Sequence, residues 1–220
     1  MPKNSNPKYF LDREDAAIQL FEAIPKGFFQ NKEIVVVALS EGAVLIADSI
    51  AKTLNVQMDI LLIESITAPN NPEFSIAKVS ETQEIAIHRV LMEAFEISEE
   101  FVYNEAKRVY DDRILSHLYR YRKGGTLQSV RDKAVLLVDE CVETDFTMIV
   151  AIKSMISKGA KNIYIGTPVM DSFSYESLLQ ICDGIFCPYR IKDYISIEYY
   201  YKNLERPEFS ELERIIERYE

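Results

Sequence analysis

Residues that build metal centres, disulfide frames and histidine-based catalytic sets are scarce in this sequence. Its three cysteines, Cys141, Cys182 and Cys187, include no C-x-x-C pair. An odd number of thiols without ligand spacing argues against a disulfide framework and a zinc site, and it indicates a reducing compartment. The two histidines, His88 and His117, lie apart and near no acid–nucleophile set. No Ser–His–Asp arrangement therefore supports a hydrolase.

Long apolar runs and an excess of positive charge are also missing. No apolar run approaches the roughly 20 residues that a membrane-spanning helix needs. The first residues, MPKNSNPKYF, lack the apolar stretch of a signal peptide. We therefore expect a cytoplasmic protein that binds no membrane. With 25 Lys and Arg against 35 Asp and Glu, the net charge of −10 argues against nucleic acid as a partner.

Solid apolar runs alternate with amphipathic segments along the chain. Short β-branched runs such as EIVVVAL (residues 33–39) predict strands buried on both faces, and the segments between them predict helices. This order is typical of an α/β fold: a doubly wound, mostly parallel sheet with helices on both faces. The alternating run 76–87 predicts a hairpin in a small hood insertion, and the charged stretch 98–123 predicts a long helix. We expect one domain over residues 9–220, preceded by a flexible N-terminus, residues 1–8.

Polar residues follow the apolar run AVLLV at a point where α/β sheets bind ligands. Asp139 and Glu140 come directly after the run, where two acids can accept hydrogen bonds from the hydroxyls of a ribose. The next helix begins near Thr144, and Thr147 follows three residues later. Their hydroxyls and the first N–H groups of the helix could hold a phosphate. The same spacing fits a plain helix cap, with Asp145 or Thr144 as the N-cap residue. The residues alone leave both interpretations open.

A series of segments, spread over roughly residues 9–213, follows the order of one protein family. YFLDREDAA matches F-x-D-R-x-D-A-G, IVVVALSEGAVLIA matches V-x-x-L-P-R-G-G-V-x-x-A, and APNNPEFSIAKV matches A-P-x-N-P-E-x-A-I-G-A-V. VLLVDECVETDFTMIVAI matches V-I-L-V-D-D-G-I-A-T-G-A-T-M-x-A-A-I, and IGTPVM, CDGIFCP and EYYYKNL follow in order. On these motifs the chain resembles the type I phosphoribosyltransferases, and more narrowly a bacterial group of short phosphoribosyltransferase-domain proteins.

The resemblance implies a ligand and a role for several residues. The ligand would be 5-phosphoribosyl 1-pyrophosphate (PRPP). Asp139 and Glu140 would bind its ribose and a magnesium-bound pyrophosphate, while Thr144 and Thr147 would bind its 5′-phosphate. Mg²⁺ would be needed only if the protein is active. No residue is assigned as a direct metal ligand, and no other cofactor is implied.

The sequence departs from the family's pattern at each anion-binding loop. At ~4 Å, two like charges repel by about 4 kcal/mol at an effective dielectric constant near 20, so acids in these loops oppose phosphate. We expect the carboxylate of Asp145 to cap the helix and to occupy the N–H groups that a phosphate would use. The departures are Glu143, Asp145 and Phe146 in the phosphate turn, Ser40, Glu41, Gly42 and Ala43 in place of Pro-Arg-Gly-Gly in the pyrophosphate loop, and Glu64 at the usual basic position after the second strand.

These departures favour a phosphoribosyltransferase-like protein with a degenerate PRPP site and a non-catalytic binding or regulatory role. The alternative is an active phosphoribosyltransferase that transfers 5-phosphoribose from PRPP to an unidentified base or amine with Mg²⁺. The retained acids and threonines leave a third interpretation, a small nucleotide, nucleoside or amine ligand. The tyrosines at 199–201 could stack on a base or anchor the C-terminal segment. Together with the long helix after Ser98, they favour a homodimer.

Overall fold

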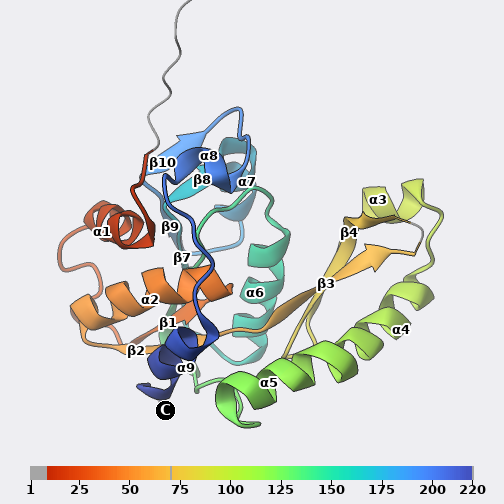
Figure 1. The fold of residues 1–220 in the computed structure, drawn as a ribbon, viewed down its shortest axis with the longest axis horizontal. Helices are drawn as coiled ribbons and strands as arrows, with labels where there is room; N and C mark the ends of the chain where they lie inside the picture. The colour runs from red at the N-terminus through yellow and green to blue at the C-terminus, as the bar shows by residue number, and fades with distance from the viewer. Residues whose placement is uncertain (1–8, 70, 220) are drawn as a thin grey trace, which may run out of the picture.

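The computed structural model describes residues 9–69 and 71–219, and a sheet of five parallel strands forms its centre (Figure 1). The two middle strands, β1 and β6, are buried along their whole length, as continuous apolar runs require. The predicted α/β fold with a mostly parallel sheet is confirmed. The flexible N-terminus expected for residues 1–8 lies outside the described residues. In sheet order the strands are β2 (Gln57–Ile60), β1 (Ile34–Ala38), β6 (Ala134–Val138), β7 (Asn162–Gly166) and β9 (Gly184–Phe186).

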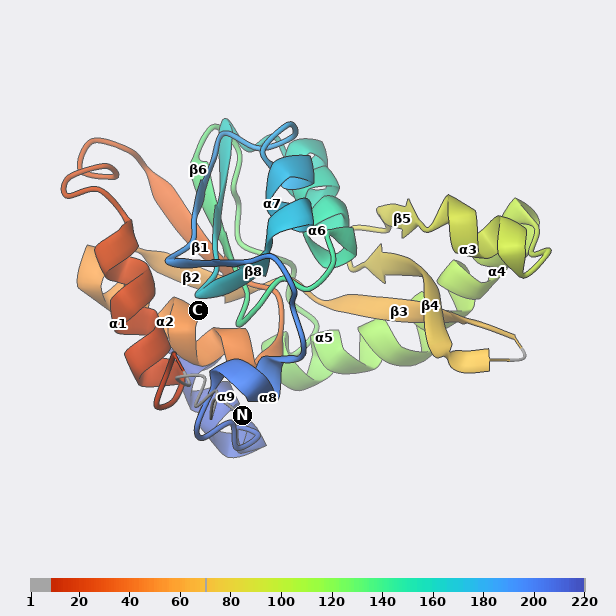
Figure 2. The ribbon, with the colours of Figure 1, turned by 90° about the horizontal axis from the view of Figure 1, so that it is seen from above.

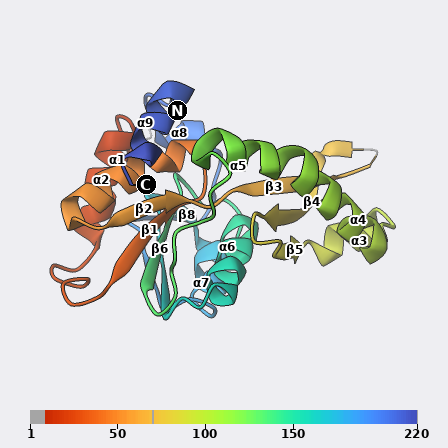
Figure 3. The same ribbon diagram turned by 90° about the horizontal axis from the view of Figure 1, so that it is seen from below.

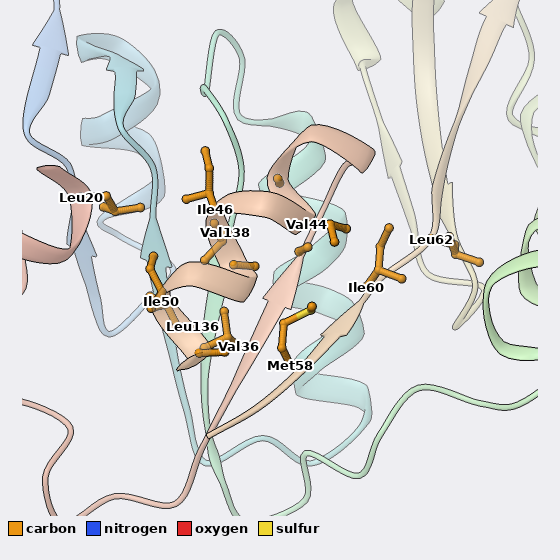
Figure 4. Close-up of a cluster of buried hydrophobic side chains, with 14 of the residues drawn as sticks. Leu20, Val36, Val44, Ile46, Ile50, Met58, Ile60, Leu62, Leu136 and Val138 are labelled. Atoms are coloured by element: carbon orange, nitrogen blue, oxygen red, sulfur yellow. The ribbon is translucent and has the colours of Figure 1, made fainter. Parts of the chain in front are cut away.

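Helices cover both faces of this sheet because side chains alternate between the faces along each strand. On one face, Val36, Leu136 and Val138 pack in a cluster with Leu20 of α1 and Ile46 of α2 (Figure 4). The opposite face packs against α6 and α7. In this second cluster, Val35, Val37 and Leu137 of the strands are buried together with Met148 of α6 and Leu178 of α7. The covering helices are α1 (Arg13–Ala23), α2 (Glu41–Leu54) and α9 (Phe209–Glu217) on the first face, and α6 (Phe146–Ser157) and α7 (Ser172–Leu178) on the second.

A hood projects to one side of the core (Figures 1 and 2). Its three antiparallel strands contain the predicted hairpin, and its helices follow the predicted helical stretch, with Ser98 as the N-cap residue of α4. A π-helical turn interrupts this stretch, which runs along β3 in Figure 3. The elements are β3 (Ile63–Ala68), β4 (Asn71–Ser80), β5 (Ile85–Ile87), α3 (Arg89–Ala94), α4 (Glu99–Val109), η1 (Tyr110–Ile114) and α5 (Leu115–Arg122).

The last part of the chain adds a small second sheet and returns to the core. The apolar run 162–170 forms two strands, because β7 ends before Pro168, which cannot donate a ladder hydrogen bond. The second of these strands, β8 (Val169–Asp171), pairs in parallel with β10 (Tyr189–Ile191). A short helix, α8 (Ile197–Tyr200), then leads through an irregular segment to α9.

A buried ionic network joins the hood to the core. The Arg122 guanidinium, at the end of α5, donates from Nη2 to both carboxylate oxygens of Glu81, and Nη1 lies 3.6 Å from Asp59 Oδ2 on β2. All three side chains are at most 5% exposed. Burial raises the pKa of Glu81, and the charge of Arg122 opposes this shift. The Nε and Nη1 atoms of Arg122 are buried and donate no hydrogen bond within the described residues.

Candidate functional site

The predicted site residues meet at the carboxyl ends of β1 and β6. These strands are neighbours, with Ala38 opposite Val138, so the loops that follow them lie side by side. One loop carries Ser40, which caps α2 by accepting a hydrogen bond from the Ala43 N–H at 3.1 Å. The other loop carries the predicted acid pair.

The first acid of the pair, Asp139, is held in a partly buried hydrogen-bond network. Its Oδ1 atom accepts from Ser40 Oγ at 2.8 Å and from the Glu140 N–H at 3.0 Å. Burial raises the pKa of Asp139 to about 6, and the nearby charge of Glu140 adds to this rise, whereas the bond from Ser40 opposes it. The group therefore changes charge close to neutral pH, as carboxyl groups in binding sites often do.

The second acid, Glu140, lies on the first turn of α2. Its Oε1 atom accepts from Arg13 Nε at 2.6 Å, and Ser40 Oγ lies 3.5 Å from its Oε2 atom. The Arg13 and Glu140 side chains are only 11% and 14% exposed. A Cβ atom built on Gly42 would lie 2.0 Å from Glu140 Oε2, so the carboxylate occupies the space that glycine leaves free. An anion at a helix N-terminus is favoured by the first N–H groups and the helix dipole.

We expect Gly42→Ala to destabilise the protein by about 1–3 kcal/mol, because the new methyl group overlaps the Glu140 carboxylate and displaces it from Arg13. Denaturant unfolding would measure the change. In a Glu140→Ala background the overlap is absent, and Gly42→Ala should then be neutral or stabilising, since alanine favours a helix by about 1 kcal/mol over glycine. An equal loss of stability in both backgrounds would show that Glu140 does not lie on Gly42.

The reversed charges in the other loops have partners inside the protein. Glu41 accepts from Tyr121 Oη at 2.6 Å and from Arg206 Nη2 at 2.9 Å. Burial disfavours its ionised form, but the hydrogen bonds from Tyr121 and Arg206 outweigh burial and lower the pKa of Glu41. Glu64 lies 3.2 Å from His117 Nδ1 and 3.6 Å from Arg113 Nη1.

Besides Arg13 and Arg206, sequence reasoning missed a third cation, Lys78 of β4. Its Nζ atom donates to Ser65 Oγ at 3.1 Å across the β3–β4 pair. Burial lowers the pKa of Lys78, and the charges of Asp139 and Glu64 oppose this shift. Lysine stands where the matched family segment A-I-G-A-V has alanine. The feature of the sequence that could have revealed it is a lysine within the otherwise apolar segment IAKV, residues 76–79.

The turn before α6 differs from the expectation. Asp145 is the N-cap residue of α6, as predicted, but its carboxylate makes no capping bond. Instead Asp145 Oδ2 accepts from Ser177 Oγ of α7 at 2.7 Å. The prediction that this carboxylate occupies the first N–H groups of the helix is therefore wrong, because a partner distant in sequence holds it. Glu143 and Thr144 are exposed, and Thr147 is half-buried.

Aromatic residues near the site have structural partners. Phe146, the first residue of α6, stacks on the imidazole of His88 with ring centroids 4.8 Å apart. Tyr200 and Tyr201 are each 1% exposed, and the Tyr201 ring lies 4.9 Å from that of Phe10. Of the two roles considered for this tyrosine cluster, the packing of Tyr200 and Tyr201 supports anchoring of the C-terminal segment.

Two kinds of feature are absent from the part of the chain that the structure describes. No group of three or more His, Cys, Asp and Glu side chains in residues 9–69 and 71–219 is arranged to hold a metal ion. Within the same part of the chain, every helix is too short or too polar to cross a membrane.

Comparisons with known proteins identify the family and the fold. A family model described as "Phosphoribosyl transferase domain" matches residues 4–201. Two curated proteins of Mycobacterium tuberculosis, "Putative phosphoribosyl transferase MT0597" and "Putative phosphoribosyl transferase Rv0571c", are each 22% identical over 162 residues. The match covers 74% of this chain but 36% of the length of these relatives. The crystal structure of TT1426 from Thermus thermophilus has a TM-score of 0.75 at 24% identity, over 96% of this chain and 98% of that one, so the two share a fold.

Proposed function

Because this chain belongs to the phosphoribosyl transferase domain family, we propose that it is a non-catalytic member with a binding or regulatory role and a degenerate PRPP site. The position of the Glu140 carboxylate is the main support for this proposal. The Glu140 carboxylate lies on the first turn of α2, held by Arg13, in the place that the resemblance assigns to pyrophosphate. A bound pyrophosphate would have to displace this carboxylate and then share the loop with Glu41.

The charges around the site support the same function. Relatives are expected to use a basic residue at the position of Glu41 and another at that of Glu64. Here both are acids, and each forms an ion pair with an arginine: Glu41 binds Arg206, and Glu64 lies 3.6 Å from Arg113. Burial lowers the pKa of a further cation, Lys78, and the charges of Asp139 and Glu64 oppose this shift.

We propose a small ligand without pyrophosphate, such as a nucleoside or nucleotide. Asp139 would accept hydrogen bonds from ribose hydroxyls, because its carboxylate stands at the edge of the sheet. The exposed Tyr103, Leu115 and Tyr119 along the hood helices support a homodimer. The three unpaired cysteines support a cytoplasmic location.

Calorimetric titration with PRPP and Mg²⁺ tests the degenerate site. We expect the native protein to bind with a dissociation constant weaker than about 1 mM, equivalent to less than about 4 kcal/mol. The variant Glu41→Arg with Glu140→Asp restores the basic loop residue and withdraws the carboxylate from α2, so it should bind at least about tenfold more tightly. The variant Glu100→Arg makes the same change of net charge at an exposed hood position and should bind as weakly as the native protein. Micromolar binding by the native protein would overturn this function.

One observation favours the active enzyme as a second candidate. The Asp145 carboxylate is turned toward Ser177, so it leaves the start of α6 to a ligand. Thr144 and Thr147 would then hold a 5′-phosphate, and Asp139 and Glu140 the ribose. The acid pair does not fit a resident Mg²⁺, because Ser40 and Arg13 already engage its oxygens and no third ligand stands nearby among the described residues. Magnesium would therefore have to arrive with PRPP, and turnover of PRPP with any base or amine would establish this candidate.

A further inference from the structure

The segment between α8 and α9 crosses the candidate site. We call residues 201–208 the C-terminal strap; in Figure 1 this blue segment runs down the front of the core, past α2. It begins at the buried Tyr201, whose Oη atom donates to the carbonyl oxygen of Glu140 at 2.8 Å. The N–H groups of Lys202 and Asn203 then donate to the carbonyl oxygens of Phe10 and Leu11, at 2.9 and 2.8 Å. The strap therefore starts on the acid pair and on the segment before α1.

The strap then contacts Arg13 of α1 and Glu41 of the pyrophosphate loop. The carbonyl oxygen of Glu205 accepts from Arg13 Nη1 at 2.5 Å, while Nε of the same arginine holds Glu140. The Arg206 guanidinium donates from both Nε and Nη2 to Glu41 Oε2, at 3.1 and 2.9 Å. Glu41 is thus the side chain through which the loop binds the strap.

The strap is weaker than the elements at its two ends. Tyr201 is 1% exposed at one end. At the other end α9 buries Leu212 and Ile215 against the core. Between them, residues 202, 203, 205 and 206 are exposed. Few buried contacts and exposed backbone hydrogen bonds are the properties of a segment that opens locally while its neighbours stay folded.

We propose that the C-terminal strap is an autoinhibitory cover of the pyrophosphate loop and that Glu41 is its anchor. The charge reversal at Glu41 then has a positive role, because a glutamate holds Arg206 where an arginine would repel it. This regulation rests on the proposed function, in which the loop no longer grips pyrophosphate. A closed strap keeps Arg206 paired with Glu41 and the Glu205 carbonyl oxygen on Arg13. An open strap uncovers the loop, where an anion still has to displace the Glu140 carboxylate from Arg13.

Amide hydrogen exchange of the ligand-free protein tests the anchor. Glu41→Arg and Arg206→Glu should each speed the exchange of the Lys202 and Asn203 N–H groups by about threefold to tenfold, because each places like charges together. The charge-swapped double variant, Glu41→Arg with Arg206→Glu, should return exchange to the native rate. The Leu212 N–H in α9 serves as the control and should not change. Unchanged exchange of Lys202 and Asn203 in the single variants would overturn the anchor, and equally faster exchange of Leu212 would show that the strap is not the unit that opens.

Titration with inorganic pyrophosphate tests whether the closed strap hinders anion binding at the pyrophosphate loop. Both Glu41→Arg and the charge-swapped variant carry arginine in the loop, but only the second closes the strap. We expect Glu41→Arg to bind pyrophosphate at least about tenfold more tightly than the charge-swapped variant. Equal binding would contradict autoinhibition. These outcomes are independent of the PRPP titration: micromolar PRPP binding by the native protein would overturn the proposed function whatever the exchange rates of the strap.

Discussion

Arg122→Met is expected to lower the free energy of unfolding by about 3–5 kcal/mol, the usual cost of removing one partner from a buried ion pair. The substitution keeps most of the side-chain volume but leaves the carboxylates of Glu81 and Asp59 buried without their cation. Because Arg122 ends the hood helix and Asp59 belongs to β2 of the core, the loss should also loosen the hood. Urea unfolding followed by circular dichroism would measure the change.

Two further variants separate the charge effect from the loss of a long side chain. Arg122→Met combined with Glu81→Gln and Asp59→Asn removes both carboxylate charges and should recover much of the lost stability. Arg108→Met removes an exposed arginine that pairs with Glu105 and Asp112. This substitution should leave the urea concentration at the unfolding midpoint almost unchanged. If the buried and exposed arginines proved equally dispensable, the network would not hold the hood to the core.

Asp139→Asn is expected to make the protein more stable at neutral pH. Burial raises the pKa of Asp139 from 3.8 to about 6, so the folded protein keeps a proton that the unfolded chain releases. Stability therefore falls as the pH rises from about 4 to about 6 and stays lower above that range. The difference between these two pKa values corresponds to a loss of up to about 3 kcal/mol in the free energy of unfolding at pH 7.

Asparagine removes this pH dependence because it cannot ionise, while its Oδ1 atom can still accept from Ser40 and the Glu140 N–H. Urea midpoints of the two proteins should agree near pH 4, and the variant should gain about 1–3 kcal/mol near pH 7. A constant difference across this range would mean that Asp139 does not titrate there. A buried acid that costs stability is expected where ligand binding, not folding, requires the carboxylate.

The strands of the central sheet, most of the helices and the place of the acid pair could be predicted because they depend on local patterns. Continuous apolar runs such as Ile34–Ala38 have one stable environment, the middle of a covered parallel sheet. Ser98 marked the start of the hood helix, and the side chain does accept the capping bond from Phe101. Asp139 and Glu140 follow a predicted strand, so the topology of the sheet brought them to the Ser40 loop without further information.

The partners of the charged side chains could not be predicted in the same way. Glu140 pairs with Arg13, a residue 127 positions away, and its place on α2 depends on the missing Cβ of Gly42. Asp145 has the local features of a capping residue, yet Ser177 of another helix holds its carboxylate. A hydrogen bond from a distant element satisfies the carboxylate oxygen, so the carboxylate no longer needs the first N–H groups of its own helix.

The amino-acid sequence by itself determined the parallel α/β fold, the hood, the family resemblance and the positions at which acids replace the family's basic and glycine residues. Only the tertiary structure decided what those acids do: Glu41 binds Arg206 of the C-terminal strap, Glu64 lies beside Arg113 and His117, and Glu140 covers the start of α2. The physical reason is that apolar periodicity is written in neighbouring residues, whereas the effect of a charge depends on groups within a few ångströms that the fold brings from distant parts of the chain.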